Sequence, residues 1–186
     1  MTTLLTLPAI ETPQLVLREI EVNDWEAFGD YMLLQSYHRY IALRFRTEDE
    51  VKAFVNRTVA RQGDERRNVF HLAAEGLREG RALGDGFIIV QRKGLVEIGW
   101  GVDPEHWGRG IGTEIGRALL GLAFERLNAK RVWAKIMSAN GASLKVARRI
   151  GMNHVENHPD YPAGSGRFEP VDIFGLTSEA YFELSY

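Results

Sequence analysis

Three glycines in one short run, Gly108, Gly110 and Gly112, are the residues with the clearest chemical meaning in this sequence. They stand between an apolar segment typical of a strand, residues 95–102, and a segment with apolar residues at helical spacing, residues 114–127. A glycine-rich turn before a helix exposes several backbone N–H groups at the positive end of the helix dipole. The run therefore predicts a phosphate-binding loop, for which a purely structural corner is the alternative.

Two common phosphate loops do not match this run. A Walker loop needs a Gly-Lys-Ser/Thr sequence, and none follows Gly112. A dinucleotide fingerprint needs a third glycine where this chain has Ile115, and an early parallel strand before the loop. Here the preceding segments, 69–74, 82–91 and 95–102, are separated by short turns (the second being Arg92, Lys93 and Gly94) and predict an antiparallel meander.

The remaining elements must position the loop. Further strands are expected at 15–18, 131–137 and 171–176, and helices are expected to begin at Asn23, Thr47, Gly141 and Thr177. Gly151 suits a left-handed end for the helix over residues 141–150. Residues 157–170, rich in Pro, Gly and Tyr, are expected to form a long loop. With 186 residues and no linker or repeat, the chain is expected to form one domain over residues 1–186.

Composition narrows the chemistry. The chain has no cysteine, which excludes disulfides, thiolate metal sites and an acyl-cysteine intermediate. A formal net charge of −2 argues against direct nucleic-acid binding. No apolar run approaches the length of a membrane span, and residues 1–11 lack the basic leader and apolar core of a signal peptide. We therefore expect a cytoplasmic protein with no membrane partner.

The glycine run has a recognisable context. The strand ending at Val102, followed by Trp107-Gly108-Arg109-Gly110-Ile111-Gly112, resembles the acetyl-CoA loop of the GNAT superfamily of N-acetyltransferases. Trp107 stands where that family usually has Gln or Arg, as in the branch similar to the ribosomal-protein N-terminal acetyltransferases. Two further blocks resemble that branch, a helix block from Asn140 to Met152 and an opening strand from Thr12 to Arg18. Together the blocks span residues 12–183.

The resemblance implies a single α+β domain, with a twisted, mostly antiparallel central sheet flanked by helices on both faces. It implies acetyl-CoA as co-substrate and no metal. The pyrophosphate fits the exposed N–H groups of Gly108 to Thr113, with the Thr113 hydroxyl as one more donor. The resemblance also places the pantetheine arm beside Val102 and Asn140. The implied cofactor-binding set is Val102, Gly108, Arg109, Gly110, Ile111, Gly112, Thr113, Asn140, Ser143 and Lys145.

Charged side chains near these blocks have two interpretations. Arg109, Lys145 and Arg148 are candidates for screening the adenosine phosphates, and solvated surface cations are the alternative for each. His154 and His158 are four residues apart, a spacing that binds metal on a helix. Because they follow a helix-ending glycine and precede a proline, and no third ligand is evident, we expect no metal site.

Acetyl transfer to an amine needs a base, donors for the tetrahedral oxygen and an acid for the leaving thiolate. The resemblance makes Ser143 the first candidate acid, with a helix cap as its alternative role. Glu97 is the candidate base, with a cross-strand ion pair to Arg92 or Lys93 as its alternative. Asp160 and Tyr161 are the second choice for base and acid. The tyrosine used as acid in other GNAT branches has no clear match, because Phe174 occupies the last strand where it would be sought.

With no cysteine, direct attack in a ternary complex is the natural mechanism. The expected acceptor is a primary amine, and the branch suggests the N-terminal α-amine of a protein. A small amine, such as a polyamine, an amino-acid derivative or a drug, is one alternative. A non-catalytic acyl-CoA-binding module is another. The sequence leaves a homodimer open.

Overall fold

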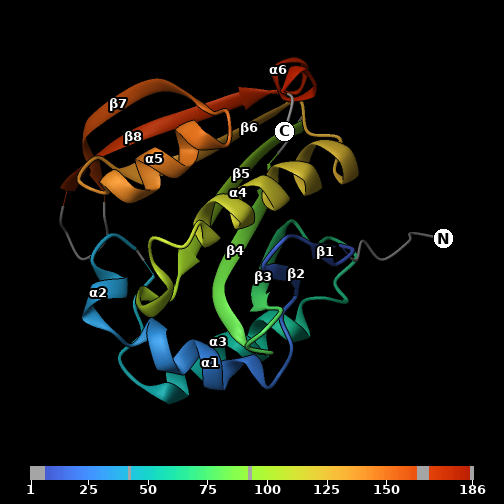
Figure 1. Ribbon diagram of the computed structural model, residues 1–186, viewed down its shortest axis with the longest axis vertical. Helices are drawn as coiled ribbons and strands as arrows, with labels where there is room; N and C mark the ends of the chain where they lie inside the picture. Colours follow the sequence, from blue (N-terminus) through green and yellow to red (C-terminus); the bar gives the residue numbers. More distant parts are fainter. Residues whose placement is uncertain (1–6, 42, 92–93, 163–167, 185–186) are drawn as a thin grey trace.

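A computed structural model describes residues 7–41, 43–91, 94–162 and 168–184 of the chain. Its centre is one twisted sheet with the strand order β1-β2-β3-β4-β5-β6-β8-β7 (Figure 1). The strands are β1 (Ile10–Glu11), β2 (Leu15–Glu19), β3 (Val69–Gly76), β4 (Ala82–Val90), β5 (Leu95–Val102), β6 (Arg131–Met137), β7 (Asn153–Pro162) and β8 (Phe168–Thr177). The helices are α1 (Asp24–Met32), α2 (Gln35–His38), α3 (Glu48–Ala60), α4 (Ile111–Gly121), α5 (Gly141–Arg149) and α6 (Ser178–Glu183). This is the expected α+β fold with a mostly antiparallel sheet.

The order of the strands follows from the lengths of the connections. Strands β3, β4 and β5 pair antiparallel as a meander, as predicted. The turn residues Arg92 and Lys93 lie outside the described residues. From β5 the chain crosses over through α4 to β6, so that β5 and β6 are the one parallel pair among the described strands.

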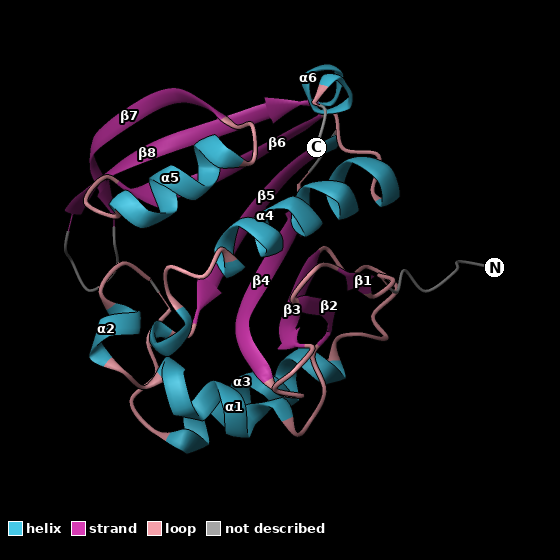
Figure 2. Cartoon of the chain, in the orientation of Figure 1, coloured by secondary structure: helices cyan, strands magenta, loops and turns pink. Residues whose placement is uncertain are grey.

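Helices cover both faces of the sheet, and a hydrophobic core lies under each layer (Figure 2). On the face we call the α4 face, α4 and α5 pack on alternate strand residues such as Leu72, Ile98 and Val132. On the opposite face, the α1 face, α1 and α3 pack over Ala73 of β3 and Ala82 of β4. Among the described residues, no helix is long and apolar enough to cross a membrane.

Helix ends follow the local sequence signals. Thr47 caps α3 by accepting the Glu50 N–H at 3.3 Å, as its sequence predicts. Gly151 has φ = 88° and ends α5 in a Schellman motif, with Met152 N–H donating to the Ala147 carbonyl at 3.0 Å. Asn23 occupies the N-cap position of α1, but its side chain makes no capping hydrogen bond. Of these three helices, α5 packs beside α4, the helix that follows the glycine loop.

The prediction of a long loop over residues 157–170 is wrong where the structure describes that segment. Residues up to Pro162 belong to β7, and residues from Phe168 belong to β8, so most of that segment forms an antiparallel hairpin. Pro159 is tolerated because β7 is an edge strand and its pairing has a bulge between His158 and Tyr161. Residues 163–167 of the expected loop lie outside the described part.

Candidate active site

The glycine loop has the backbone geometry that only glycine adopts easily. Gly108 and Gly110 have φ values of 77° and 86°, both in the left-handed region. Gly110 is the N-cap residue of α4, which begins at Ile111, three residues earlier than the sequence pattern indicated. The helix dipole therefore points its positive end at this loop.

The loop offers a row of unused donors. Thr113 and Glu114 donate their N–H groups to the Gly110 carbonyl, at 2.9 and 3.1 Å. From Gly108 to Gly112, no N–H group donates to another described residue. Five consecutive amides at a helix start fit the pyrophosphate of acetyl-CoA. Thr113 differs from the expectation in one respect, because only its hydroxyl is available to a ligand.

A second open feature is the gap between β5 and β6. Their pairing stops at Glu97 opposite Trp133, although both strands continue to Val102 and Met137. Asp103 N–H donates to a β4 carbonyl at 2.9 Å, so by alternation the backbone groups of Val102 and its even-numbered neighbours face the gap. Trp107 Nε1 donates to the Val102 carbonyl at 2.8 Å. The N–H groups facing the gap remain available to an extended ligand.

The loop and the gap adjoin each other. A Cβ atom added at Gly112 would lie 3.5 Å from Val146 of α5, 3.6 Å from Val102 and 3.8 Å from Trp100. The start of α4, the adjacent face of α5 and the end of β5 therefore lie close together around Gly112. A ligand with phosphates and a long flexible arm fits this arrangement, with the phosphates on the loop and the arm along the gap.

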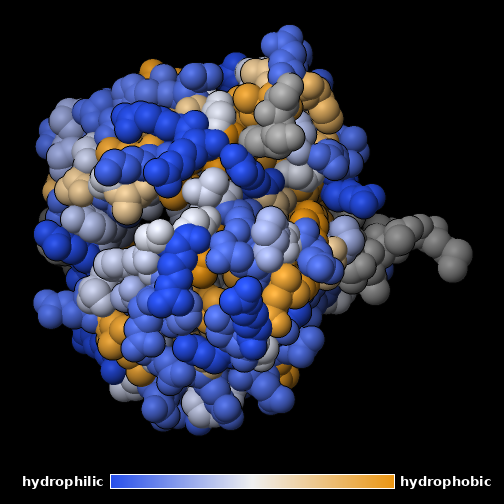
Figure 3. Space-filling model, viewed as in Figure 1, coloured by the Kyte–Doolittle hydropathy of each residue, from blue (hydrophilic) through white to orange (hydrophobic). Residues whose placement is uncertain are grey.

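Asn140 and Ser143 share the start of α5. Asn140 Oδ1 accepts the Ser143 N–H at 3.1 Å, so Asn140 is the N-cap of α5. The cap role that was the alternative for Ser143 belongs to Asn140, and the Ser143 hydroxyl makes no hydrogen bond within the described part of the chain. Lys145 and Arg148 are exposed on the same helix, over which Figure 3 shows a strongly hydrophilic surface.

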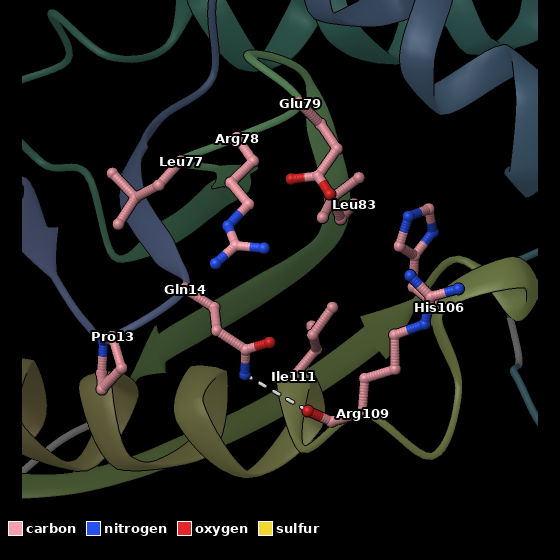
Figure 4. A pocket seen from close by; sticks show the side chains of 9 residues that line it. All are labelled: Pro13, Gln14, Leu77, Arg78, Glu79, Leu83, His106, Arg109 and Ile111. Carbon is pink, nitrogen blue, oxygen red and sulfur yellow. Dashed lines mark hydrogen bonds between the residues drawn. The ribbon is translucent and has the colours of Figure 1, made fainter.

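Arg109 is separated from those two cations. It lines a cavity of about 360 Å³ between the glycine loop and the β3–β4 turn. In Figure 4 its side chain runs toward His106, while Arg78 enters the cavity from the β3–β4 turn. Gln14 also lines this cavity, and its Nε2 donates to the Arg109 carbonyl at 3.2 Å. The lining of this cavity includes Arg109 but neither Lys145 nor Arg148.

Two of the expected catalytic side chains, Glu97 and Tyr161, lie on the α1 face. Glu97 alternates with the core residues Val96 and Ile98 and so points away from α4. Burial raises the pKa of Glu97, and the positive charge of Lys135 partly opposes that rise. Lys135 Nζ in turn donates to the Tyr161 hydroxyl at 3.1 Å.

The structure thus joins Glu97 to Tyr161 through Lys135 and leaves the other candidates apart. Asp160 is exposed in β7, and Ser143 lies on the α4 side of the sheet. Among the described residues, Lys135 is the cation whose charge lowers the pKa of Glu97. Arg92 and Lys93, the expected ion-pair partners, lie outside the described residues.

The histidines expected not to bind metal lie on β7, where His154 Nε2 is 2.8 Å from Asp172 and His158 Nε2 is 3.1 Å from Glu156. No group of three or more His, Asp or Glu residues among those described is arranged to hold a metal ion. Phe174, in the position where other branches suggested a tyrosine, is fully buried.

One residue near the site was missed at the sequence level. Asp85, in the middle of β4, is only 6% exposed and accepts hydrogen bonds from Tyr37 and Tyr31. The sequence feature that could have indicated this buried carboxylate is its place between two glycines, Gly84 and Gly86, in an otherwise apolar strand.

The fold, the glycine loop and the adjacent β5–β6 gap indicate the class of acyl-CoA-dependent transferases, and comparison with known proteins places the chain within it. The model of the acetyltransferase (GNAT) domain matches residues 14–153. An uncharacterized N-acetyltransferase, YnaD of Bacillus subtilis, is 30% identical over 77% of this chain and 81% of its own length. The chain belongs to the GNAT acetyltransferase family.

Solved structures agree in fold. A putative ribosomal-protein-serine acetyltransferase from Vibrio cholerae has a TM-score of 0.80 at 20% identity, covering 93% of this chain and 99% of its own. RimL, a ribosomal L7/L12 α-N-protein acetyltransferase in complex with coenzyme A, has a TM-score of 0.80 at 17% identity, with coverage of 93% and 99%. A chimera of spermidine N-acetyltransferase from Vibrio cholerae has a TM-score of 0.76 at 17% identity, with coverage of 92% and 99%.

Proposed function

We propose that this acetyl-CoA-dependent N-acetyltransferase acts on the N-terminal α-amine of a protein. The observation that carries the proposal is an open groove of about 600 Å³ on the α1 face. The groove crosses β5, β6, β8 and β7 and includes Trp133, the pairing partner of Glu97, and Tyr161. An open groove of this kind accommodates an extended peptide that ends beside the β5–β6 gap.

The donor side of the proposal rests on the glycine loop. The amides of Gly108 to Gly112 would hold the pyrophosphate, and the gap beside Val102 would hold the pantetheine arm. An N–H group facing the gap, such as that of Val102, would donate to the oxygen that becomes negative during attack. The capping bond of Asn140 uses Oδ1, so its side-chain N–H₂ group, which donates to no other residue in the described part of the chain, could donate to the arm.

The reaction balances with the side chains available. The neutral amine nitrogen forms a bond to the thioester carbonyl carbon, the C–S bond breaks, and coenzyme A leaves as a thiolate. Glu97 takes the amine proton, directly or through water, and the Ser143 hydroxyl delivers a proton to the thiolate and regains one from solvent. A free α-amine has a pKa of about 7.7–8.0 against about 10.4 for lysine, so a single carboxylate base suits the α-amine better.

The acceptor is tested with peptides. Short peptides with free α-amines, the same peptides with an internal lysine and a blocked N-terminus, and a set of small amines including spermidine are incubated with acetyl-CoA, and release of free thiol is followed. Acetylation of the free α-amines with the highest kcat/KM supports the proposal. A higher kcat/KM for spermidine or another small amine would assign a small-molecule acceptor. Tight acetyl-CoA binding without thiol release from any acceptor would indicate a non-catalytic module.

A further inference from the structure

Asp85 is a buried carboxylate without a strong cationic partner. Of the three buried aspartates among the described residues, Asp24 is 2.8 Å from Arg18, and Asp103 is 3.6 Å from Arg81. Among the described side chains, the basic group paired with Asp85 is that of His71, whose Nε2 lies 3.6 Å from Oδ2 and which is a cation only when protonated. Hydrogen bonds from Tyr37 and Tyr31 partly offset the cost of burying this carboxylate, but no permanently charged side chain among the described residues compensates its charge.

The hydrogen bonds of Asp85 leave half of its carboxylate unused. The hydroxyl groups of Tyr37 and Tyr31 both donate to Oδ1, at 2.6 and 3.3 Å. Burial raises the pKa of both tyrosines well above the usual value, so both stay protonated and act as donors. Oδ2 accepts no hydrogen bond from a described residue, although an ionised carboxylate has about four acceptor sites.

Asp85 lies over the strand that borders the β5–β6 gap. It pairs with Gly101 of β5, and a Cβ atom at Gly101 would collide with Asp85 Oδ1 and the Tyr37 hydroxyl. A Cβ atom at Gly99 would collide in the same way with the ring of Phe87. On the α1 face of β5, glycine thus makes room for a carboxylate and an aromatic ring from β4.

The β5 residues that face the α1 side also include the candidate base, Glu97. Glu97, Gly99 and Gly101 share the α1 face, and at about 3.3 Å per residue Gly99 lies about 7 Å from each of the other two. The ring of Phe87 lies over Gly99, between Glu97 on one side and, on the other, Gly101 with the carboxylate of Asp85 above it. Aromatic faces and a desolvated carboxylate both favour a cation over a neutral group.

We propose that Asp85 binds the protonated amine of the acceptor and so selects cationic acceptors for this reaction. The proposal rests on the acetyl transfer proposed above and names the group that recognises the amine. At neutral pH an α-amine is mostly protonated, and Asp85 would hold that form through Oδ2 until its proton passes to water or Glu97. The buried carboxylate then receives its cation from the substrate.

The test compares a charged and a neutral ligand on the same protein. A hexapeptide with a free N-terminal alanine and its N-acetylated form are titrated by calorimetry into the protein saturated with coenzyme A, for the wild type, Asp85→Asn and Asp30→Asn. Asp30→Asn is the matched control, because this substitution removes the same charge from an exposed position on α1. We expect the wild type and Asp30→Asn to bind the free-amine peptide at least about 10-fold more tightly, and Asp85→Asn to lose that preference. In steady-state assays Asp85→Asn should raise KM for the amine by a similar factor, with a smaller change in kcat.

Several outcomes overturn the proposal. Equal binding of the two peptides by the wild type does so without any variant, and so does a preserved preference in Asp85→Asn with unchanged acetyl-CoA affinity. If peptides are not acetylated but a small amine is, the α-amine proposal fails, and the KM of that amine in Asp85→Asn decides the role of Asp85. A purely structural role would lower the melting temperature and leave the amine preference intact.

Discussion

Replacing Gly112 with alanine separates binding of acetyl-CoA from stability of the fold. Gly112 is the second residue of α4, and its φ does not lie in the left-handed region. The added Cβ atom would lie 3.5–3.8 Å from Val146, Val102 and Trp100, which is ordinary van der Waals contact. Since alanine favours a helix over glycine by up to about 1 kcal/mol, we expect the melting temperature to be unchanged or higher by about 2–4 °C.

The same methyl group would enter the space between α4, α5 and β5 that we propose for acetyl-CoA. Overpacking of a filled contact costs about 1–3 kcal/mol, which corresponds to a rise in Kd of about 5- to 150-fold. Isothermal titration of acetyl-CoA and a thermal melt of the same preparation give both quantities.

Gly121→Ala is the matched control for this variant. Gly121 is the last residue of α4, and a Cβ atom there would lie 3.6 Å from the Tyr181 hydroxyl, again in ordinary contact. It lies about 13 Å along the helix from Gly112, far from the loop. Gly121→Ala should match the stability gain and keep the wild-type Kd. An unchanged Kd in Gly112→Ala would refute the placement of acetyl-CoA in this groove.

Three further predictions concern the candidate catalytic groups and the fold. The raised pKa of Glu97 should place the acid limb of kcat/KM above the usual glutamate range; Glu97→Gln should lower kcat by about 10²–10⁴-fold and remove that limb. Because burial disfavours ionised Glu97, the free energy of unfolding should fall as pH rises through the pKa of Glu97 in the folded protein. Glu97→Gln should therefore not lower the melting temperature at pH 7. A lower melting temperature would contradict burial as the cause of the raised pKa. Asn140→Ala should cost about 1 kcal/mol in urea unfolding, whereas Ser143→Ala should cost little stability and lower kcat; an unchanged kcat would remove Ser143 from the reaction. Asp24→Asn should cost about 3 kcal/mol, the lower end for breaking a buried pair, because Arg18 keeps its contact with Glu75; a loss under 1 kcal/mol, also by urea unfolding, would show that the pair contributes little.

Most of the fold was predictable because its signals are local. Positive φ at Gly108, Gly110 and Gly151, the Thr47 cap and the β3–β4–β5 meander all follow from residue types within a few positions. The prediction over residues 157–170 was wrong because Pro159 was read as a loop signal. Whether a proline interrupts a strand depends on which edge of the sheet the strand occupies, and that is a property of the whole fold.

The sequence by itself determined the family and the local geometry of the glycine loop. The glycine run, its helix and the Asn140 block are contiguous segments whose backbone conformation and exposed amides are set locally, so the family and a phosphate-binding type of loop could be predicted from them. The tertiary structure decided how the candidate catalytic groups are arranged. It placed Glu97 with Lys135 and Tyr161, kept Ser143 on the opposite side of the sheet, and buried Asp85 beneath Tyr31 and Tyr37. Those neighbours come from strand pairing and helix packing between distant segments, which no spacing within a single segment encodes.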